Sequence, residues 1–171
     1  MYPAVPDVNP AMQSIGAWAR MRALATLFLA AGLLAGAANT KADAQQFDPA
    51  QYKGQVIYLD FWASWCVPCR LSFPWMNELQ AEYSGKGFTI VAVNVDHDAA
   101  AAQRFLEQAP ASFKIVYDPS GKIAQKYPLK GMPTSFLIGR DGTVRFEHDG
   151  FSNAHRDEYL AHINALIAEK K

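Results

Sequence analysis

Cys66 and Cys69 are the residues best suited to chemistry in this 171-residue chain, and they are its only two cysteines. Two residues separate them, so a disulfide between them closes a loop too short to remove much entropy from the unfolded chain. A structural crosslink would join distant segments instead. The spacing therefore favours a pair whose disulfide opens and closes in thiol–disulfide exchange.

A metal site is the alternative use of two cysteines at this spacing. Structural zinc requires four ligands, usually two such pairs or one pair with two histidines. The histidines form no close pair near the cysteines; they are His97, His148, His155 and His162. We expect redox chemistry and no metal ligand set, while transient copper binding by the reduced dithiol stays open.

The residues around the cysteines predict a buried strand that ends, and a helix that begins, at Cys66. Residues 56–63 are mostly apolar and rich in β-branched and aromatic side chains, and apolar residues recur at helical spacing from Phe73 to Tyr83. The first N–H groups of a helix lack partners. Together with the helix dipole they favour an anion, here a thiolate at Cys66.

The N-terminal region has the three parts of a secretory signal peptide. Arg20 and Arg22 precede an uncharged, apolar stretch, and Ala42-Asp43-Ala44 supplies small residues before a cleavage site at Gln45. The apolar stretch is shorter than the roughly 20 residues that span a bilayer. An uncleaved membrane anchor is the alternative.

We therefore predict a signal peptide over residues 1–44 and a single domain over residues 45–171, located in the periplasm or another extracytoplasmic compartment. Met21-Arg22 alone would begin a normal signal peptide, so we hypothesise that translation starts at Met21. The chain carries 16 basic and 16 acidic residues with no basic patch, which argues against nucleic-acid binding.

Hydrophobic patterning predicts an α/β domain with a central mixed sheet covered by helices. The predicted strands are residues 56–61, 89–95, 113–117, 135–139 and 143–148. The predicted helices are residues 66–85, 99–108 and 123–127, with a last one that begins at Ser152 or Asn153.

The sequence resembles the thioredoxin superfamily, and more closely its TlpA/ResA-like extracytoplasmic thiol–disulfide oxidoreductases. The resemblance covers roughly residues 47–168 and rests on three motifs: DFWASWCVPCR at 60–70, VAVNVD at 91–96 and GMPTSFLI at 131–138. It implies a thioredoxin-like fold in which residues 98–117 are an extra helix and strand inserted before the Met132-Pro133 element.

Two departures from that branch bear on the substrate. Members that serve cytochrome c maturation commonly have a glutamate three residues after the second cysteine, where this chain has Ser72. Only 11 residues lie between the expected cleavage site at Gln45 and the strand at residue 56, so we expect the branch's extra N-terminal strands to be missing. Both departures weaken the transfer of apocytochrome c as substrate.

The resemblance implies catalytic roles for three residues. Cys66, exposed at the helix start, attacks a substrate disulfide, and the more buried Cys69 resolves the mixed disulfide. Asp60 stands in a buried strand, where burial raises the pKa of a carboxyl group, and it is the candidate acceptor of the Cys69 proton. The alternative is that Asp60 caps or pairs locally.

Substrate contacts are implied for Trp65, which would cover one side of the sulfur pair, and for Met132 and Pro133. The Met132-Pro133 bond is expected to be cis, with Met132 offering backbone hydrogen bonds to an extended substrate. No cofactor is expected beyond the redox-active Cys66–Cys69 disulfide.

Three functions remain open: an exported reductase of protein disulfides, an oxidase that introduces disulfides, and a copper metallochaperone or cytochrome-assembly reductant. Val67 and Pro68 provide no charge or imidazole to stabilise the Cys66 thiolate, which favours the reductase. A reductase in an oxidising compartment implies a membrane electron donor. We expect a monomer.

Overall fold

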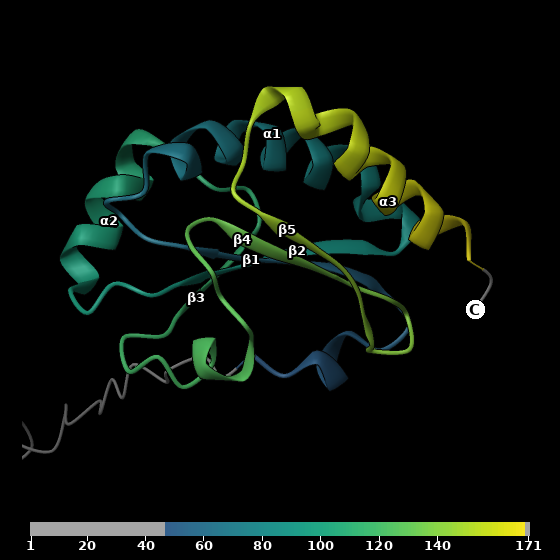
Figure 1. The fold of residues 1–171 in the computed structure, drawn as a ribbon, viewed down its shortest axis with the longest axis horizontal. Coiled ribbons are helices and arrows are strands. Elements are labelled where there is room, and N and C mark those ends of the chain that lie inside the picture. The colour runs from purple at the N-terminus through teal and green to yellow at the C-terminus, as the bar shows by residue number, and fades with distance from the viewer. Residues whose placement is uncertain (1–46, 170–171) are drawn as a thin grey trace, which may run out of the picture. The chain divides into compact units, whose positions relative to one another are not determined.

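Seven consecutive buried residues form the central strand, β1 (Val56–Trp62), of a computed structural model that describes residues 47–169. On one side of β1 lie β2 (Phe88–Asn94) and then β3 (Lys114–Tyr117), parallel to it; on the other lie β4 (Thr134–Ile138) and then β5 (Val144–Asp149), in antiparallel pairings (Figure 1). Burial on both faces explains the apolar sequence of β1. The predicted signal peptide lies outside the described residues.

The helices of the described region gather on one face of this sheet. They are α1 (Val67–Tyr83), α2 (Ala99–Gln108) and α3 (Arg156–Ala168), and they share a core with the even-numbered residues of β1 (Figure 1). The odd-numbered residues of β1 face the other side, as the alternation of a strand requires. There they pack with two 3₁₀ turns, η1 (Pro49–Tyr52) and η3 (Ala124–Lys126). Two further turns, η2 (Ser84–Lys86) and η4 (Asn153–His155), follow α1 and precede α3.

The predicted fold class is confirmed, including the inserted helix and strand, which are α2 and β3. Residues 123–127 form only the turn η3 instead of the predicted helix, because Pro128 disfavours helical backbone at Tyr127, which is extended. The last helix begins at Arg156, after the turn η4. Within residues 47–169, η1 is the one element before β1. No helix of this region is long and apolar enough to cross a membrane.

The inserted helix α2 is anchored beside the start of α1. Asp98 caps it, since the Asp98 carboxylate accepts a hydrogen bond from the N–H of Ala100 at 2.9 Å. Phe105 is buried, with its ring centroid 4.7 Å from that of Trp62 and 4.9 Å from that of Phe73. This aromatic cluster therefore ties the insertion to the end of β1 and to α1.

Replacing Phe105 by alanine should lower the free energy of unfolding by about 3–5 kcal/mol, since it leaves a cavity among aromatic rings. Denaturant unfolding of the oxidised protein, followed by circular dichroism, measures the change. Leu71→Ala is the matched control: its side chain is exposed, so the effect should stay within about 0.5 kcal/mol. Equal effects of the two substitutions would contradict the anchoring role of Phe105.

Candidate active site

Cys66 and Cys69 form a disulfide at the N-terminus of α1. Cys66 is the N-cap residue of this helix, and the Cys66 sulfur accepts a hydrogen bond from the N–H of Cys69 at 3.2 Å. Pro68, at the second helical position, has no N–H to offer. The predicted junction of strand and helix is confirmed, and one backbone donor is seen at the sulfur.

The prediction that Cys66 is exposed is wrong for this oxidised state. Cys66 exposes 3% of its surface and Cys69 none, and both belong to the core on the helical face of the sheet. The preceding loop turns Cys66 inward, since the N–H of Cys66 bonds to the carbonyl of Ala63 at 3.1 Å. Trp65 and Val67 point outward instead, exposing 69% and 70% of their surfaces. Cys66 is more exposed than Cys69, as predicted, but the difference between their exposed fractions is small.

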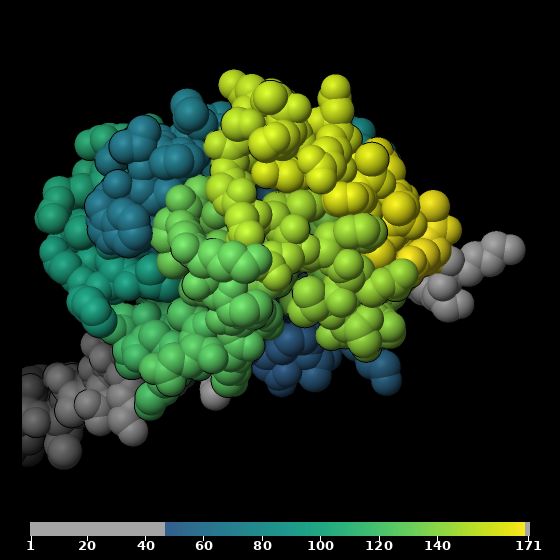
Figure 2. All heavy atoms as spheres, viewed as in Figure 1, coloured from purple at the N-terminus to yellow at the C-terminus, as the bar shows by residue number. Residues whose placement is uncertain are grey.

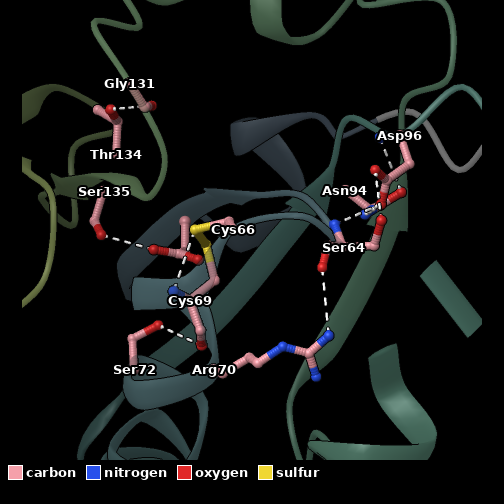
Figure 3. The surroundings of a disulfide bond; sticks show 11 residues. Ser64, Cys66, Cys69, Arg70, Ser72, Asn94, Asp96, Gly131, Thr134 and Ser135 are labelled. Atoms are coloured by element: carbon pink, nitrogen blue, oxygen red, sulfur yellow. Dashed lines mark hydrogen bonds between the residues drawn. A yellow bond between two sulfur atoms is a disulfide. The ribbon is translucent and has the colours of Figure 1, made fainter. Parts of the chain in front are cut away.

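Asp96, which our sequence analysis assigned no role, holds the loop before Cys66 in place. The Asp96 carboxylate accepts bonds from the N–H and the hydroxyl of Ser64 at 2.8 and 3.0 Å, and from the side-chain amide of Asn94 at 2.8 Å (Figure 3). The sequence could have indicated this role, because Asn94 and Asp96 lie where β2 ends beside β1. Polar residues at the carboxyl ends of neighbouring parallel strands lie close together.

Arg70, directly after Cys69, is bound away from the sulfurs. Figure 3 shows its side chain extending toward Ser64. The guanidinium donates to the side-chain carbonyl of Gln108 at 2.7 Å and to the carbonyl of Ser64 at 3.5 Å, and it lies 4.8 Å from the centroid of the Phe105 ring. Its charge is therefore directed to α2 rather than to a thiolate at Cys66.

Asp60 lies in the middle of β1 and is almost fully buried on the face that carries Trp62 and the cysteines. One carboxylate oxygen accepts a hydrogen bond from the hydroxyl of Ser135 on β4 at 2.8 Å, and the other has no partner; the dashed line from Ser135 in Figure 3 marks this bond. Burial raises the pKa of Asp60 from 3.8 to about 7, and the Ser135 bond opposes that rise. Since Ser135 is 75 residues away in sequence, Asp60 is not a local cap.

Within residues 47–169, no positively charged side chain bonds to Asp60, and burial and the Ser135 bond are the two causes that set its pKa. Ser135 lies opposite His148 of β5 in the strand pairing. His148 is buried and hydrogen-bonded to His162 of α3 at 2.9 Å, and burial, together with the charge of His162, lowers the pKa of His148 to about 4. Burial, with Asp60 nearby, raises the pKa of Tyr58 well above its usual value. The Asp60 carboxylate is therefore held mainly by Ser135.

The Met132-Pro133 bond is cis, as expected. The Thr134 hydroxyl donates to the carbonyl of Gly131 at 2.9 Å, which closes the loop around the bond, and the N–H of Gly150 donates to the carbonyl of Pro133 at 2.8 Å. Met132 is half-buried and packs against the core that contains both cysteines. In the space-filling view the start of α1 (blue) lies at the surface between α2 (teal) and this loop (green) (Figure 2). The substrate-binding roles of Trp65, Met132 and Pro133 stay predictions.

Comparison with known proteins places this geometry among thiol–disulfide enzymes. The Redoxin family profile matches residues 6–163. The thiol-disulfide oxidoreductase ResA of Bacillus thuringiensis subsp. konkukian is 35% identical over 125 residues, 72% of each chain.

Solved structures agree with that comparison. A protein from Chlorobium tepidum assigned as thiol:disulfide interchange protein DsbE shares 50% identity at a TM-score of 0.68, over 70% of this chain and 84% of that one. A secreted Mycobacterium tuberculosis disulfide oxidoreductase homologous to E. coli DsbE shares 26% identity at a TM-score of 0.59, over 70% and 88%.

In the reduced protein Cys66 should be alkylated before Cys69, because its sulfur receives a helix-terminal N–H and keeps the residual exposure. Limiting iodoacetamide near neutral pH, followed by peptide mass spectrometry, measures the order. The same reaction in denaturant is the control and should label both cysteines equally. Faster labelling of Cys69 would reverse their roles.

Asp60→Asn should remove a pH dependence of stability. The raised pKa means that folded Asp60 keeps a proton that the unfolded chain loses, so the contribution of Asp60 to stability is most favourable below pH 3.8 and falls as the pH rises through about 7. The full difference is about 4 kcal/mol, from roughly three pH units at 1.36 kcal/mol each.

Denaturant unfolding of the oxidised protein between about pH 4.5 and 8.5 tests this prediction. The exposed Glu107→Gln on α2 is the matched control and should leave the wild-type slope unchanged. Parallel curves for wild type and Asp60→Asn would show that Asp60 does not titrate abnormally.

Proposed function

The chain belongs to the Redoxin family, in the TlpA/ResA-like branch of the thioredoxin superfamily, and from this premise we propose that it works as an exported reductase of protein disulfides. Its protein thiol–disulfide oxidoreductase activity follows from the Cys66–Cys69 pair and from relatives named for that activity. The direction of electron flow, the exported location and the electron donor are the proposed parts.

One observation supports the reducing direction: few groups near the Cys66 sulfur could stabilise a thiolate there. It receives one backbone N–H, Pro68 withholds another, and Arg70 is engaged with α2. Strong oxidants owe their high potential to a stabilised reduced form. A weakly stabilised thiolate instead corresponds to a low potential, which suits a reductant.

Reduction proceeds through two exchanges. The Cys66 thiolate attacks one sulfur of the partner disulfide, which forms a mixed disulfide and releases the other partner sulfur as a thiolate. The Cys69 thiol then loses its proton and attacks the Cys66 sulfur, releasing the second partner thiolate. Solvent protonates both released thiolates. The products are a partner dithiol and the Cys66–Cys69 disulfide, the state seen in the structure.

Asp60 is the proposed acceptor of the Cys69 proton. It lies on the sheet face that packs with the cysteines, one of its oxygens has no hydrogen-bond partner, and its pKa of about 7 lets it exchange a proton near neutral pH. Ser135 is a positioning residue in this scheme because it orients the carboxylate through the 2.8 Å bond.

Export and re-reduction complete the proposal. The signal-peptide pattern of residues 20–44 and the secreted Mycobacterium tuberculosis relative support an extracytoplasmic location. There the Cys66–Cys69 disulfide has to be reduced after each turnover, so a membrane electron donor is proposed. A monomer is sufficient, since the cysteines and Asp60 come from one chain.

Apocytochrome c is left out of the proposed substrates. Ser72 occupies the position where a glutamate would be expected, and it is buried, with its hydroxyl donating to the carbonyl of Cys69 at 3.1 Å. The side chain at this position therefore braces the first turns of α1 and provides no carboxylate.

The redox potential should lie below about −180 mV, and Pro68→Ala should raise it by on the order of 30 mV. Alanine restores an N–H at the helix start, and about 1.4 kcal/mol of added thiolate stabilisation corresponds to that shift. Equilibration in glutathione buffers, with oxidised and reduced protein separated after alkylation, measures both values.

Val67→Ala is the matched control, since it changes the same dipeptide but keeps every N–H; it should retain the wild-type potential. A wild-type potential near about −120 mV would make the protein an oxidant and contradict the proposed direction.

A further inference from the structure

A hollow of about 240 Å³ lies beside the disulfide, between the loop before Cys66 and the inserted helix α2. Its lining residues are Ser64, Arg70, Ala101, Arg104, Phe105 and Gln108. Two of the six are arginines and none is acidic. Ser64 lies two residues before Cys66 and Arg70 directly follows Cys69, so sequence neighbours of both cysteines line this hollow.

The Arg70 side chain is fixed by its neighbours in a position from which it can bind a planar anion. Its guanidinium stacks over the Phe105 ring at 4.8 Å and donates to Gln108 at 2.7 Å and to the carbonyl of Ser64 at 3.5 Å. These contacts use two of the five N–H donors of a guanidinium. The remaining donors form the fork that matches a carboxylate, and little side-chain entropy is left to lose on binding.

Arg104 adds a second positive charge that is free to move. Its one ion pair, with Asp98, is long at 3.6 Å, and both side chains are about two-thirds exposed. Such a pair contributes little, so Arg104 can exchange Asp98 for a carboxylate of another molecule. Asp96, which bonds to Ser64 of the lining, is buried and already holds the Ser64 and Asn94 side chains.

An apolar surface adjoins the two arginines. Trp65, Val67 and Leu71 are more than half exposed. Val67 and Leu71 lie four residues apart on α1, and Arg70 lies between them on the same side of the helix. A polypeptide covering this surface would thus bury apolar groups over the disulfide while it placed a side chain in the hollow.

We propose that this hollow binds a carboxylate side chain of the partner protein, an Asp or Glu close to the disulfide that Cys66 attacks. The proposal rests on the proposed function for the nature of the partner and deepens it by naming a recognition feature. The inserted helix α2 supplies four of the six lining residues, so it acts as a specificity element as well as part of the core.

The test uses disulfide peptides with a single Glu at successive positions around the cysteine, each paired with its Gln counterpart. Wild-type protein should favour the Glu peptide at one or two positions, by about fivefold in kcat/KM and in affinity. Arg104→Gln should weaken this preference, since Arg70 remains, and Arg104→Glu should reverse it. Fluorescence anisotropy with the oxidised protein reports binding independently of turnover.

Lys86→Glu is the matched control. It makes the same change of charge just beyond the far end of α1, about 25 Å from Cys66 by helix rise, and it should keep the wild-type preference. Equal binding and turnover of the Glu and Gln peptides at every position, or a preference that survives in both Arg104 variants, would overturn the inference. A Glu preference in binding without any turnover would support the hollow and contradict the proposed function instead.

Discussion

The hydrogen bond from the Cys69 N–H to the Cys66 sulfur is the contact on which the rest of the site depends. It exists because β1 ends where α1 begins, so an unsatisfied helix N–H meets the first cysteine. Asp96 fixes the intervening loop through Ser64. Pro68 limits the number of donors, so in the proposed function the same helix terminus activates Cys66 and leaves its thiolate only modestly stabilised.

Burial of Asp60 places a destabilising group in the centre of the sheet. A buried carboxyl group in β1 that one hydroxyl donor stabilises opposes folding above neutral pH, and an apolar residue would pack there without that penalty. Asp60 lies on the sheet face that packs with the fully buried Cys69. In the proposed mechanism this burial has a use, because a shielded thiol needs a proton acceptor whose pKa lies near neutral pH. Stability and chemistry thus oppose one another at one residue.

The insertion links the hydrophobic core to the surface around the disulfide. The Phe105 ring packs against Trp62 and Phe73 in the core, and the Arg70 guanidinium stacks over the same ring. A single side chain therefore stabilises α2 and positions a charge beside the cysteines. This dual use explains why the arginine that follows Cys69 faces α2 and not the sulfurs.

The sequence by itself determined the order of the strands and of α1, α2 and α3, together with the cysteine pair, because hydrophobic period and cysteine spacing are local properties. The cis Met132-Pro133 bond was predicted from the resemblance to thioredoxin-like proteins. Only the tertiary structure decided the features that depend on distant segments. Ser135 lies directly opposite Asp60 on the adjacent strand β4, Asp96 holds Ser64 from beyond the end of β2, and Arg70 turns to α2. Cys66 is buried for the same reason: its exposure depends on how the loop folds back onto the core, and no local pattern encodes that packing.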